Sequence, residues 1–404
     1  MIPVSKAFNI IDDEVSAIGP ERIAVENAVG RVLAENIVAD MDMPPFNRSQ
    51  MDGFAVRAVD VADAPVVLRL VGESAAGRGW HDRMKRGESV RIMTGAPIPL
   101  GADTVQKLEL ALETSSQDAN EEITILESVE KGKFIVTKGS EIRKGAVLFQ
   151  KGSLVSEGMI AGIAAFGYST LEVAKRPAVA VLSTGSEIVP IDRIPGRDQI
   201  RNSNSLMLKA LCEQAGASTK LLPISGDHLE KLKARISKAA NDDKTDVLVI
   251  TGGVSVGKYD LTKAALRELE AEIYFERVRL KPGKPAVFAR LGKMLIFGLP
   301  GNPVSSAVTF YLFVRRAIRR MQGASEIGLR SGYARTSRRL KGAAERETYL
   351  PIALKTSNDA TLIAEALKWG GSSDFVGFAN AEALAKIPRG RIYEESEIVE
   401  IVYI

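Results

Sequence analysis

Between residues 178 and 321, short runs of continuous apolar residues alternate with longer segments in which apolar residues recur every three or four positions. The apolar runs lie at 178–182, 219–224 and 246–250, and the helical patterns at 204–216, 228–240 and 261–271. Continuous apolar runs indicate strands buried on both faces, and their alternation with helices is typical of a parallel sheet covered on both sides. The pattern therefore predicts a central doubly wound α/β domain.

The same pattern continues toward the C-terminus and then changes. Two further strand-like runs, 285–291 and 293–299, bracket a turn, and 304–321 reads as a long apolar helix. Residues 324–404 are rich in β-forming runs, interrupted by a helical pattern at 378–387. We therefore expect a C-terminal β domain after the α/β domain.

The N-terminal half mixes helical and β patterns. Helical spacing predicts helices at 5–18, 24–34 and 157–166, whereas residues 66–149 contain short β-forming runs that indicate a small barrel or sandwich. The predicted fold class is a multidomain α/β plus β protein, in which a helical/β N-terminal half and a C-terminal β domain flank the α/β domain. The expected domains are a discontinuous helical domain at 1–40 and 140–175, a β-rich insertion at 41–139, the α/β domain at 176–323 and the C-terminal domain at 324–404.

Composition and charge narrow the class of protein. Of 404 residues, 45% are hydrophobic and 26% are charged, as is ordinary for a soluble globular protein. The formal net charge is only +4 and both signs are interspersed, so we expect a small-molecule partner and no nucleic acid. No apolar run approaches the about 20 residues of a membrane span, and the N-terminus lacks a signal-peptide layout. We therefore expect no membrane partner and a cytoplasmic location.

Few residues could bind a soft metal ion. The chain has one cysteine, Cys212, and two histidines, His81 and His228, which are too few for a zinc or copper site. A metal would have to be held by carboxylates, which favours magnesium. Cys212 lies on an apolar helical pattern, so we interpret it as a buried core thiol, and the absence of a second cysteine favours a reducing compartment.

A glycine-rich turn follows the third apolar run, in the sequence TGGVSVGKYDLTK at Thr251–Lys263. A buried strand, a glycine turn and an acid at the start of a helix are how an α/β sheet presents a phosphorylated or metal-bound ligand at its carboxyl edge. Polar segments at other strand ends carry Glu187 and Asp227, which could meet Asp260 around one cation. The alternative is that each acid is a solvated loop residue.

A second set of residues suits an anion. Lys281 and Lys284 lie on a stiff, glycine-containing turn, which fits an oxyanion. Backbone N–H groups at the start of the 304–321 helix, with the Ser305 hydroxyl, offer another anion site, and Asn302 is a good helix cap. The sequence thus has both acidic residues that could bind a metal ion and hydrogen-bond donors that could bind an anion. This combination favours a reaction on a phosphate group.

Six motifs support a specific resemblance. In chain order they are PPFNRSQMDGFAV, STGSE, SNSLML, TGGVSVGKYDLTK, KPGKP and GLPGNPVS. With this order and spacing, the chain resembles the molybdopterin molybdenumtransferase family (MoeA and the E domain of gephyrin) from about Pro3 to the C-terminus. The resemblance implies a homodimer that converts adenylylated molybdopterin and molybdate to molybdenum cofactor and AMP with Mg²⁺. It also suggests the upstream molybdopterin adenylyltransferase as a partner.

The resemblance also implies roles for individual residues. The pterin nucleotide would be held by the turn that contains Gly252, Gly253, Val254, Ser255 and Gly257. Mg²⁺ would be bound by Glu187, Asp227 and Asp260, which with Asp52 form the catalytic set. The oxyanion would be bound by Lys281, Lys284, Ser305, Arg346 and Ser372. Further substrate-binding positions are Ser183, Thr184, Gly185, Pro300, Asn302, Glu109 and Glu141. Asp52 and Glu109 would reach the cleft from the partner subunit. The alternative for Glu109 and Ser372 is that they are ordinary polar residues on the surface.

Some residues depart from the family pattern, all in the β-rich part of the N-terminal half. Val136 stands where the family usually has an arginine, Glu141 replaces an aspartate, and Gln106 and Lys107 replace an apolar pair. Either that region tolerates change or the chain is a paralogue with altered activity. The alternative function is therefore a non-catalytic molybdopterin-binding or scaffold protein. An adenylyltransferase of the related α/β family is a weaker third hypothesis, because it would not require the flanking β domains.

Overall fold

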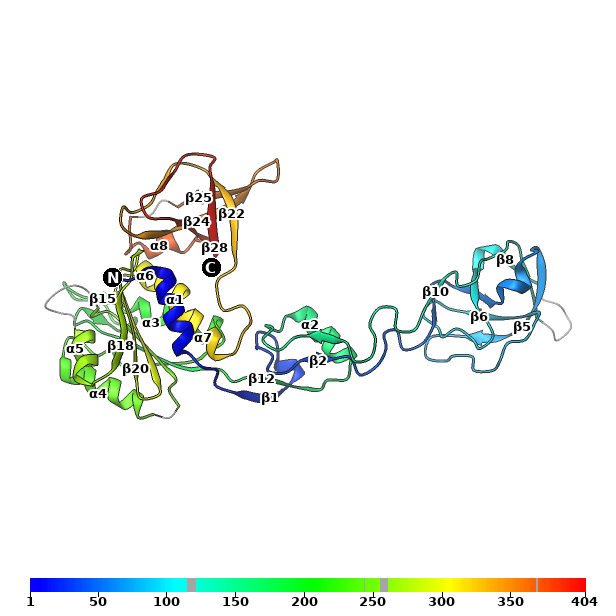
Figure 1. Ribbon diagram of the computed structural model, residues 1–404, viewed down its shortest axis with the longest axis horizontal. Helices are drawn as coiled ribbons and strands as arrows, with labels where there is room; N and C mark the ends of the chain where they lie inside the picture. The colour runs from blue at the N-terminus through cyan, green and yellow to red at the C-terminus, as the bar shows by residue number, and fades with distance from the viewer. Residues whose placement is uncertain (115–120, 243, 255–260, 368–369) are drawn as a thin grey trace. The chain divides into compact units, whose positions relative to one another are not determined.

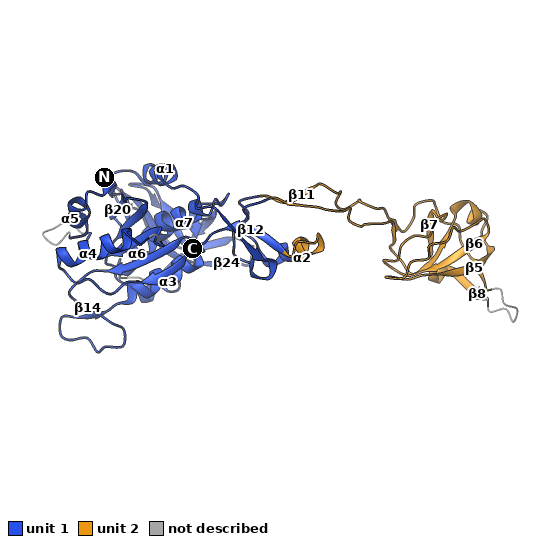
Figure 2. Cartoon of the chain, turned by 90° about the horizontal axis from the view of Figure 1, so that it is seen from below, with its two compact units in different colours: residues 1–35, 151–160, 170–404 blue, residues 36–150, 161–169 orange. Residues whose placement is uncertain are grey.

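The computed structural model describes residues 1–114, 121–242, 244–254, 261–367 and 370–404. The chain forms two compact units (Figure 2). Unit 1 contains residues 1–35, 151–160 and 170–404, and unit 2 contains residues 36–150 and 161–169. Because the chain divides into two units, the expected division into four domains stays a prediction. No helix in the described part of the chain is long and apolar enough to cross a membrane.

A six-stranded, mostly parallel sheet in unit 1 confirms the predicted α/β core (Figure 1). Its strands, in spatial order, are β16 (Ser218–Leu221), β13 (Ala178–Ser183), β17 (Val247–Thr251), β21 (Met294–Leu299), β20 (Pro285–Leu291) and β18 (Glu272–Arg277). The first four are parallel, whereas β20 and β18 are antiparallel to their neighbours. Strand β18 was not predicted from the sequence.

Helices cover both faces of this sheet, which explains the continuous apolar runs. On β17, Val247 and Val249 pack with α1 (Val4–Glu14), α3 (Ser203–Gln214), α6 (Pro303–Thr309) and α7 (Arg315–Met321). The alternate residues Leu248 and Ile250 pack with α4 (Leu229–Ala240) and α5 (Leu261–Glu268). A π-helical turn, Phe310–Val314, joins α6 to α7, so the predicted long helix is one continuous rod. Successive residues of a strand point to opposite faces of the sheet, and here helices bury both faces from solvent.

The buried thiol is also confirmed. Cys212 is fully buried on α3, and burial raises its pKa to about 12. The thiol therefore stays protonated and unreactive at neutral pH.

The C-terminal β domain of unit 1 is a six-stranded sheet (Figure 1). Its strands are β19 (Leu280–Lys281), β24 (Glu347–Thr356), β25 (Leu362–Ala366), β22 (Ser331–Thr336), β28 (Ile398–Tyr403) and β26 (Ala383–Ile387). Strand β24 also pairs with β26, and the pair β23 (Leu340–Lys341) and β27 (Ile392–Tyr393) lies beside the sheet. Because β19 precedes α6 in the chain and pairs with β24, the sheet is joined to the α/β core.

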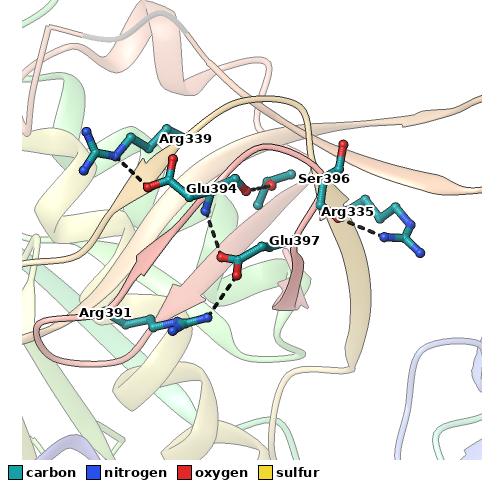
Figure 3. A network of polar contacts seen from close by, with 7 residues as sticks. Arg335, Arg339, Arg391, Glu394, Ser396 and Glu397 are labelled. Carbon is teal, nitrogen blue, oxygen red and sulfur yellow. Dashed lines mark hydrogen bonds and ion pairs between the residues drawn. The ribbon is translucent and has the colours of Figure 1, made fainter.

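A polar network holds the turn between β27 and β28 (Figure 3). Arg339 pairs with Glu394 at 3.2 Å, Arg391 pairs with Glu397 at 3.3 Å, and the Glu394 N–H donates to Glu397 at 2.8 Å. The paired side chains are 41–65% exposed, so each pair contributes little stability on its own.

The sequence-based helix assignment was wrong at two places. The segment 24–34 forms the end of β1 (Pro20–Ala24), a 3₁₀ turn at Val25–Asn27 and irregular chain, because β1 pairs with β12 (Thr170–Ala174). The segment 378–387 forms the end of a short helix, α8 (Phe375–Phe378), and strand β26. Ala383, Leu384 and Ala385 are buried in the core of unit 1, so tertiary packing overrides the helix propensity of alanine and leucine.

Unit 2 is built around one six-stranded sheet. In spatial order it contains β7 (Thr104–Lys107), β4 (Gly53–Val56), β6 (Glu88–Ile92), β5 (Val66–Ser74), β9 (Glu122–Ile125) and β8 (Ala111–Thr114). The remaining strands are short pairs, β2 (Ile37–Val38) with β11 (Val147–Phe149) and β3 (Arg48–Ser49) with β10 (Ile135–Val136). The predicted helix α2 (Glu157–Ala165) is present at the junction of the two units in the chain.

Candidate functional site

A cavity of about 580 Å³ lies in unit 1 where β17 and β21 end and α6 begins. This is the carboxyl edge of the parallel strands, where open α/β sheets bind their ligands. The cavity brings together ten of the predicted substrate-binding residues: Gly252, Gly253, Val254, Lys281, Lys284, Pro300, Asn302, Ser305, Arg346 and Ser372. Arg346 and Ser372 come from the C-terminal β domain, so two domains of unit 1 build this cavity.

The glycine turn has a conformation that only glycine adopts readily. Gly252 and Gly253 have φ angles of +96° and +62°. A Cβ atom added at Gly252 would lie 2.5 Å from the carbonyl oxygen of Thr184. The turn is also fixed by hydrogen bonds, since Gly252 N–H donates to Leu299 O at 3.1 Å and Thr262 N–H donates to Gly253 O at 3.1 Å. The predicted residues Ser255, Gly257 and Asp260 lie outside the described residues.

Three cations of the cavity have no acidic partner among the described residues. Within the described part of the chain, no carboxylate lies within 4.0 Å of the charged groups of Lys281, Lys284 or Arg346. Arg346 Nη1 donates weakly to Leu280 O at 3.4 Å, which leaves most of the guanidinium N–H groups free for a ligand. Uncompensated cations at one wall of a cavity favour an oxyanion, because fixed donors can replace its hydration shell.

The N-terminus of α6 differs from the prediction in two respects. The Val304 N–H donates to Ser372 O at 3.1 Å, so this backbone group is already used within the protein. Asn302 makes no side-chain cap; its Nδ2 donates to Ser372 Oγ at 2.8 Å. Asn302 is therefore the N-cap residue of α6, with a proline in the first helical positions as predicted, but its side chain makes no capping hydrogen bond. Val304 N–H is not available to a ligand, and the anion site at the start of this helix stays a prediction. The C-terminal domain supplies the cap, which also places Ser372 in the cavity wall.

Two of the predicted acidic metal ligands, Glu187 and Asp227, lie in two loops that are hydrogen-bonded to each other. The Ser186 N–H donates to Asp227 Oδ2 at 2.9 Å, and the Asp227 N–H donates to Ser186 Oγ at 3.1 Å. Glu187 follows Ser186 directly, so both predicted carboxylates belong to this loop pair. In the described ranges there is no group of three or more His, Cys, Asp or Glu residues that could hold a metal ion. The third predicted ligand is Asp260, so the Mg²⁺ site stays a prediction.

Two further cavities in the α/β domain account for the remaining predicted residues of unit 1. A pocket of about 540 Å³ is lined by Ser183 and Thr184, and it shares Gly252, Gly301 and Asn302 with the cationic cavity. Gly185 lines a separate pocket of about 610 Å³. The STGSE loop therefore lines two pockets, one of which shares residues with the cationic cavity.

The other predicted acids lie in unit 2. Asp52 accepts hydrogen bonds from Thr94 N–H at 2.7 Å and Thr94 Oγ1 at 3.0 Å, and these two donors hold the pKa of its carboxyl below the usual value. Asp52 is therefore ionised at neutral pH. Glu109 lies on a 3₁₀ turn at Leu108–Leu110, and Glu141 pairs with Arg48 at 3.1 Å. Their contribution to a cleft in a partner subunit stays a prediction.

The departures of unit 2 from the family pattern have local explanations. Val136 lies opposite Arg48 in the β3–β10 pair, and Arg48 places a guanidinium beside Glu141. A positive charge is therefore present near the position where the family usually has its own arginine.

Gln106 is buried, yet its amide is satisfied, since Nε2 donates to Glu127 O at 2.6 Å and Oε1 accepts from Lys107 N–H at 3.1 Å.

Comparisons with known proteins agree with this geometry. Three family models match successive parts of the chain: the MoeA N-terminal region (domain I and II) at 2–167, a probable molybdopterin binding domain at 180–320, and the MoeA C-terminal region (domain IV) at 333–404. The molybdopterin molybdenumtransferase of Staphylococcus aureus (strain COL) is 32% identical over 99% of this chain and 95% of its own length. The chain belongs to the MoeA family.

Other MoeA relatives are equally similar along the whole chain. The molybdopterin molybdenumtransferase of Bacillus subtilis (strain 168) is 33% identical over 100% of this chain and 94% of its own length. A crystal structure of a molybdopterin biosynthesis MoeA protein from Pyrococcus horikoshii superposes with a TM-score of 0.83 at 31% identity, covering 100% of this chain and 99% of that chain. The MoeA fold is therefore confirmed over the full chain.

Several residues of the site escaped the sequence-based prediction. The pockets are also lined by Asn202, Asn204, Gly283, Gly371, Ser373 and Phe375. Asn204 lies in the SNSLML motif, which indicated the family without indicating a role. Phe375 lies in a region of β pattern, and no sequence signal placed it near the glycine turn.

Proposed function

We propose that this MoeA protein inserts molybdate into adenylylated molybdopterin and releases AMP, in molybdenum cofactor biosynthesis. The observation that carries the proposal is the cavity beside the glycine turn, in which Lys281, Lys284 and Arg346 have no acidic partner within the described part of the chain. Molybdate is a tetrahedral dianion, and three fixed cations match its charge and its donor requirement. The curated names of the relatives support the same reaction class.

Different residues of the cavity would bind the two substrates. Lys281, Lys284 and Arg346 would bind and orient molybdate, with Ser305 and Ser372 as neutral donors. The backbone of Gly252 and Gly253 would let the pyrophosphate approach closely, because no Cβ atom stands in the way. Holding both substrates in one cavity lowers the entropic part of the barrier.

The proposed cofactor is Mg²⁺. Glu187 and Asp227 supply hard oxygen ligands from two loops that are hydrogen-bonded together, which fits this ion. With Asp260 they would hold it, and the bound ion would neutralise charge on the phosphate groups as AMP leaves. We further propose that the enzyme acts as a homodimer in which Asp52 and Glu109 of unit 2 reach the cleft of the partner subunit.

The test of the reaction is direct. Purified protein is mixed with adenylylated molybdopterin, Mg²⁺ and molybdate, and AMP is measured over time. Molybdate-dependent release of AMP is the expected result. Tight binding of adenylylated molybdopterin without AMP release would instead favour the alternative, a non-catalytic molybdopterin-binding or scaffold protein.

The replacement Asp227→Asn tests the metal site. Asparagine keeps an acceptor for the Ser186 N–H but removes the charge, so we expect the loops to keep their shape. The Mg²⁺ concentration needed for half-maximal AMP release should rise at least about tenfold, because an anionic carboxylate binds Mg²⁺ more strongly than a neutral amide oxygen does. The measurement is a Mg²⁺ titration of the initial rate.

The matched control is Asp246→Asn. Asp246 also accepts a backbone N–H, that of Ala178 at 2.7 Å, but it lies at the start of β17, at the opposite edge of the sheet. The Mg²⁺ concentration that the Asp246→Asn variant needs for half-maximal AMP release should equal that of the wild type. If the Mg²⁺ requirement is unchanged in Asp227→Asn, or if it rises equally in both variants, Asp227 is not a ligand of the metal.

A further inference from the structure

The C-terminal β domain contains a cavity of its own, of about 760 Å³. It lies beside the short strand β23, and its described lining includes Arg338, Arg339 and Lys341. All three are cations, and no described acid lines the cavity. We call it the Lys341 cavity. A concave surface that carries one sign of charge concentrates ligands of the opposite sign, so this lining favours an anion.

Arg338 is held in place by the backbone at the end of β25. Its Nη2 donates to Ala366 O at 2.8 Å and to Leu367 O at 3.3 Å. Both acceptors are neutral carbonyl oxygens, and among the described residues no carboxylate lies within 4.0 Å of the guanidinium. These hydrogen bonds therefore fix the position of Arg338 without neutralising its charge. The remaining N–H groups of the guanidinium are left for a ligand.

Arg339 is oriented by the polar network of the turn between β27 and β28 (Figure 3). Its Nε lies 3.2 Å from the Glu394 carboxylate, and the Glu394 N–H donates to Glu397 at 2.8 Å, so the acid that holds Arg339 is itself fixed. The terminal nitrogens of Arg339 point away from Glu394 (Figure 3). Arg339 is therefore a paired cation that still presents N–H groups.

Lys341 makes no side-chain hydrogen bond or ion pair with a described residue. Its charge is uncompensated, like that of Arg338. The acid that precedes Ala366 in the chain, Glu365, is already paired with Lys355 at 2.6 Å. Two uncompensated cations at one cavity repel each other, and a bound oxyanion would remove that repulsion while accepting from both.

Apolar residues form much of the remaining wall. Leu340 is 2% exposed and packs, with Ala366 and the half-buried Leu350, in the hydrophobic core of this sheet. The cations therefore stand beside a rigid apolar surface. Cavities of about 300–1,000 Å³ hold small molecules, and this cavity is larger than a single tetrahedral anion requires. The lining fits a molecule with an anionic group at one end and an apolar body.

We propose that the Lys341 cavity binds a phosphate-bearing small molecule, with Arg338 and Lys341 on the phosphate group and Leu340 and Leu350 against the body of the ligand. No described residue lines both this cavity and the cationic cavity of the α/β domain. The site is therefore additional to the one proposed for molybdate and does not depend on it. The phosphate group belongs either to free pyrophosphate or to a nucleotide, and the experiment distinguishes the two.

The test is a labelling experiment on the full chain that reports on Lys341 alone. The protein is treated with acetic anhydride at increasing concentrations of inorganic pyrophosphate in one arm and ADP in the other, and acetylation of each lysine is measured by peptide mass spectrometry. Lys341 should be protected in a saturable manner. The internal control is Lys355, which belongs to the same sheet and does not line the cavity, so its acetylation should not change.

Arg338→Ala tests the second cation without altering the lysine that is observed. The probe concentration that half-protects Lys341 should rise at least about tenfold, because a charge-assisted hydrogen bond is lost. Arg338→Lys should restore part of the affinity, since it keeps the charge. The matched control is Arg335→Ala: Arg335 also donates to a backbone carbonyl, Ser396 O at 2.9 Å, but does not line the cavity. Its half-protecting concentration should equal that of the wild type.

The two probes identify the ligand. Tighter protection by ADP than by pyrophosphate would mean that the apolar wall holds a nucleotide body, whereas equal or weaker protection by ADP would mean that the free anion is the ligand. The proposal is overturned if neither probe protects Lys341, if Lys355 is protected equally, or if Arg338→Ala and Arg335→Ala behave alike.

Turnover separates this inference from the proposed function. Arg338→Ala should release AMP with an unchanged KM for molybdate, because Arg338 does not line the cationic cavity. Protection of Lys341 in a protein that releases no AMP would keep the site and reject the reaction. Normal AMP release without protection of Lys341 would reject the site and keep the reaction.

Discussion

Replacing Lys284 by alanine is expected to raise the KM for molybdate by about 10- to 100-fold. Lys284 lines the cationic cavity and has no acidic partner within the described residues, so its charge is available to the oxyanion. A hydrogen bond from a charged donor contributes about 1.5–3 kcal/mol, and about 1.4 kcal/mol corresponds to a tenfold change in affinity. The measurement is the initial rate of AMP release as molybdate is varied at saturating adenylylated molybdopterin.

The variant should fold normally, because the structural role of Lys284 is made by its backbone. Its carbonyl oxygen accepts the Val278 N–H at 3.1 Å, and alanine keeps that bond. The matched control is Lys293→Ala, at the turn that ends the same strand, β20, away from the cavity. Arg346→Ala should behave like Lys284→Ala. If molybdate dependence stays the same in both cavity variants, or shifts equally in Lys293→Ala, the oxyanion site has been placed wrongly.

The α/β core could be predicted from the sequence because both faces of its sheet are covered. When every residue of a strand is buried, as in β17, the apolar run is continuous and the strand is evident without any structure. The prediction failed where local and long-range preferences disagree. The alanine-containing segment that forms β26 favours a helix locally, but pairing with β24 and β28 buries it as a strand. No local pattern contains that pairing.

The residues of the site also divide into those that the sequence predicts and those that only the structure shows. Glycines, lysines and polar loops at strand ends could be found by motif, because each has a chemical reason to stand at its position. The cap of α6 by Ser372 could not be found, since it joins residues far apart in the sequence. Phe375 was missed for the same reason: an exposed aromatic gains meaning only when the pocket beside it is known. The resemblance to the MoeA family supplied Arg346 and Ser372, which the residue pattern alone did not.

Replacing Gly252 by alanine is expected to reduce activity strongly. The residue has φ +96°, and the added Cβ atom would lie 2.5 Å from Thr184 O, a backbone atom that cannot move alone. An unfavourable backbone conformation costs about 1–3 kcal/mol, and the turn or the Thr184 loop must shift in addition. Because Gly252 lines both the cationic cavity and its neighbour, we expect kcat/KM to fall about 100-fold or more, as misplacement of bound groups by about 1 Å does.

The control Gly292→Ala separates backbone strain from displacement of the loop. Gly292 also has a left-handed conformation, φ +60°, but no atom lies within 4 Å of an added Cβ, and the residue is in the turn after β20. Urea unfolding should show a moderate loss of stability in both variants, larger in Gly252→Ala, whereas AMP release should fall only in Gly252→Ala. Equal loss of activity in the two variants would mean that general destabilisation causes the effect. Full activity in Gly252→Ala would show that close approach of a ligand to this turn is not required, and the role of the glycine turn in holding the pyrophosphate would have to be abandoned.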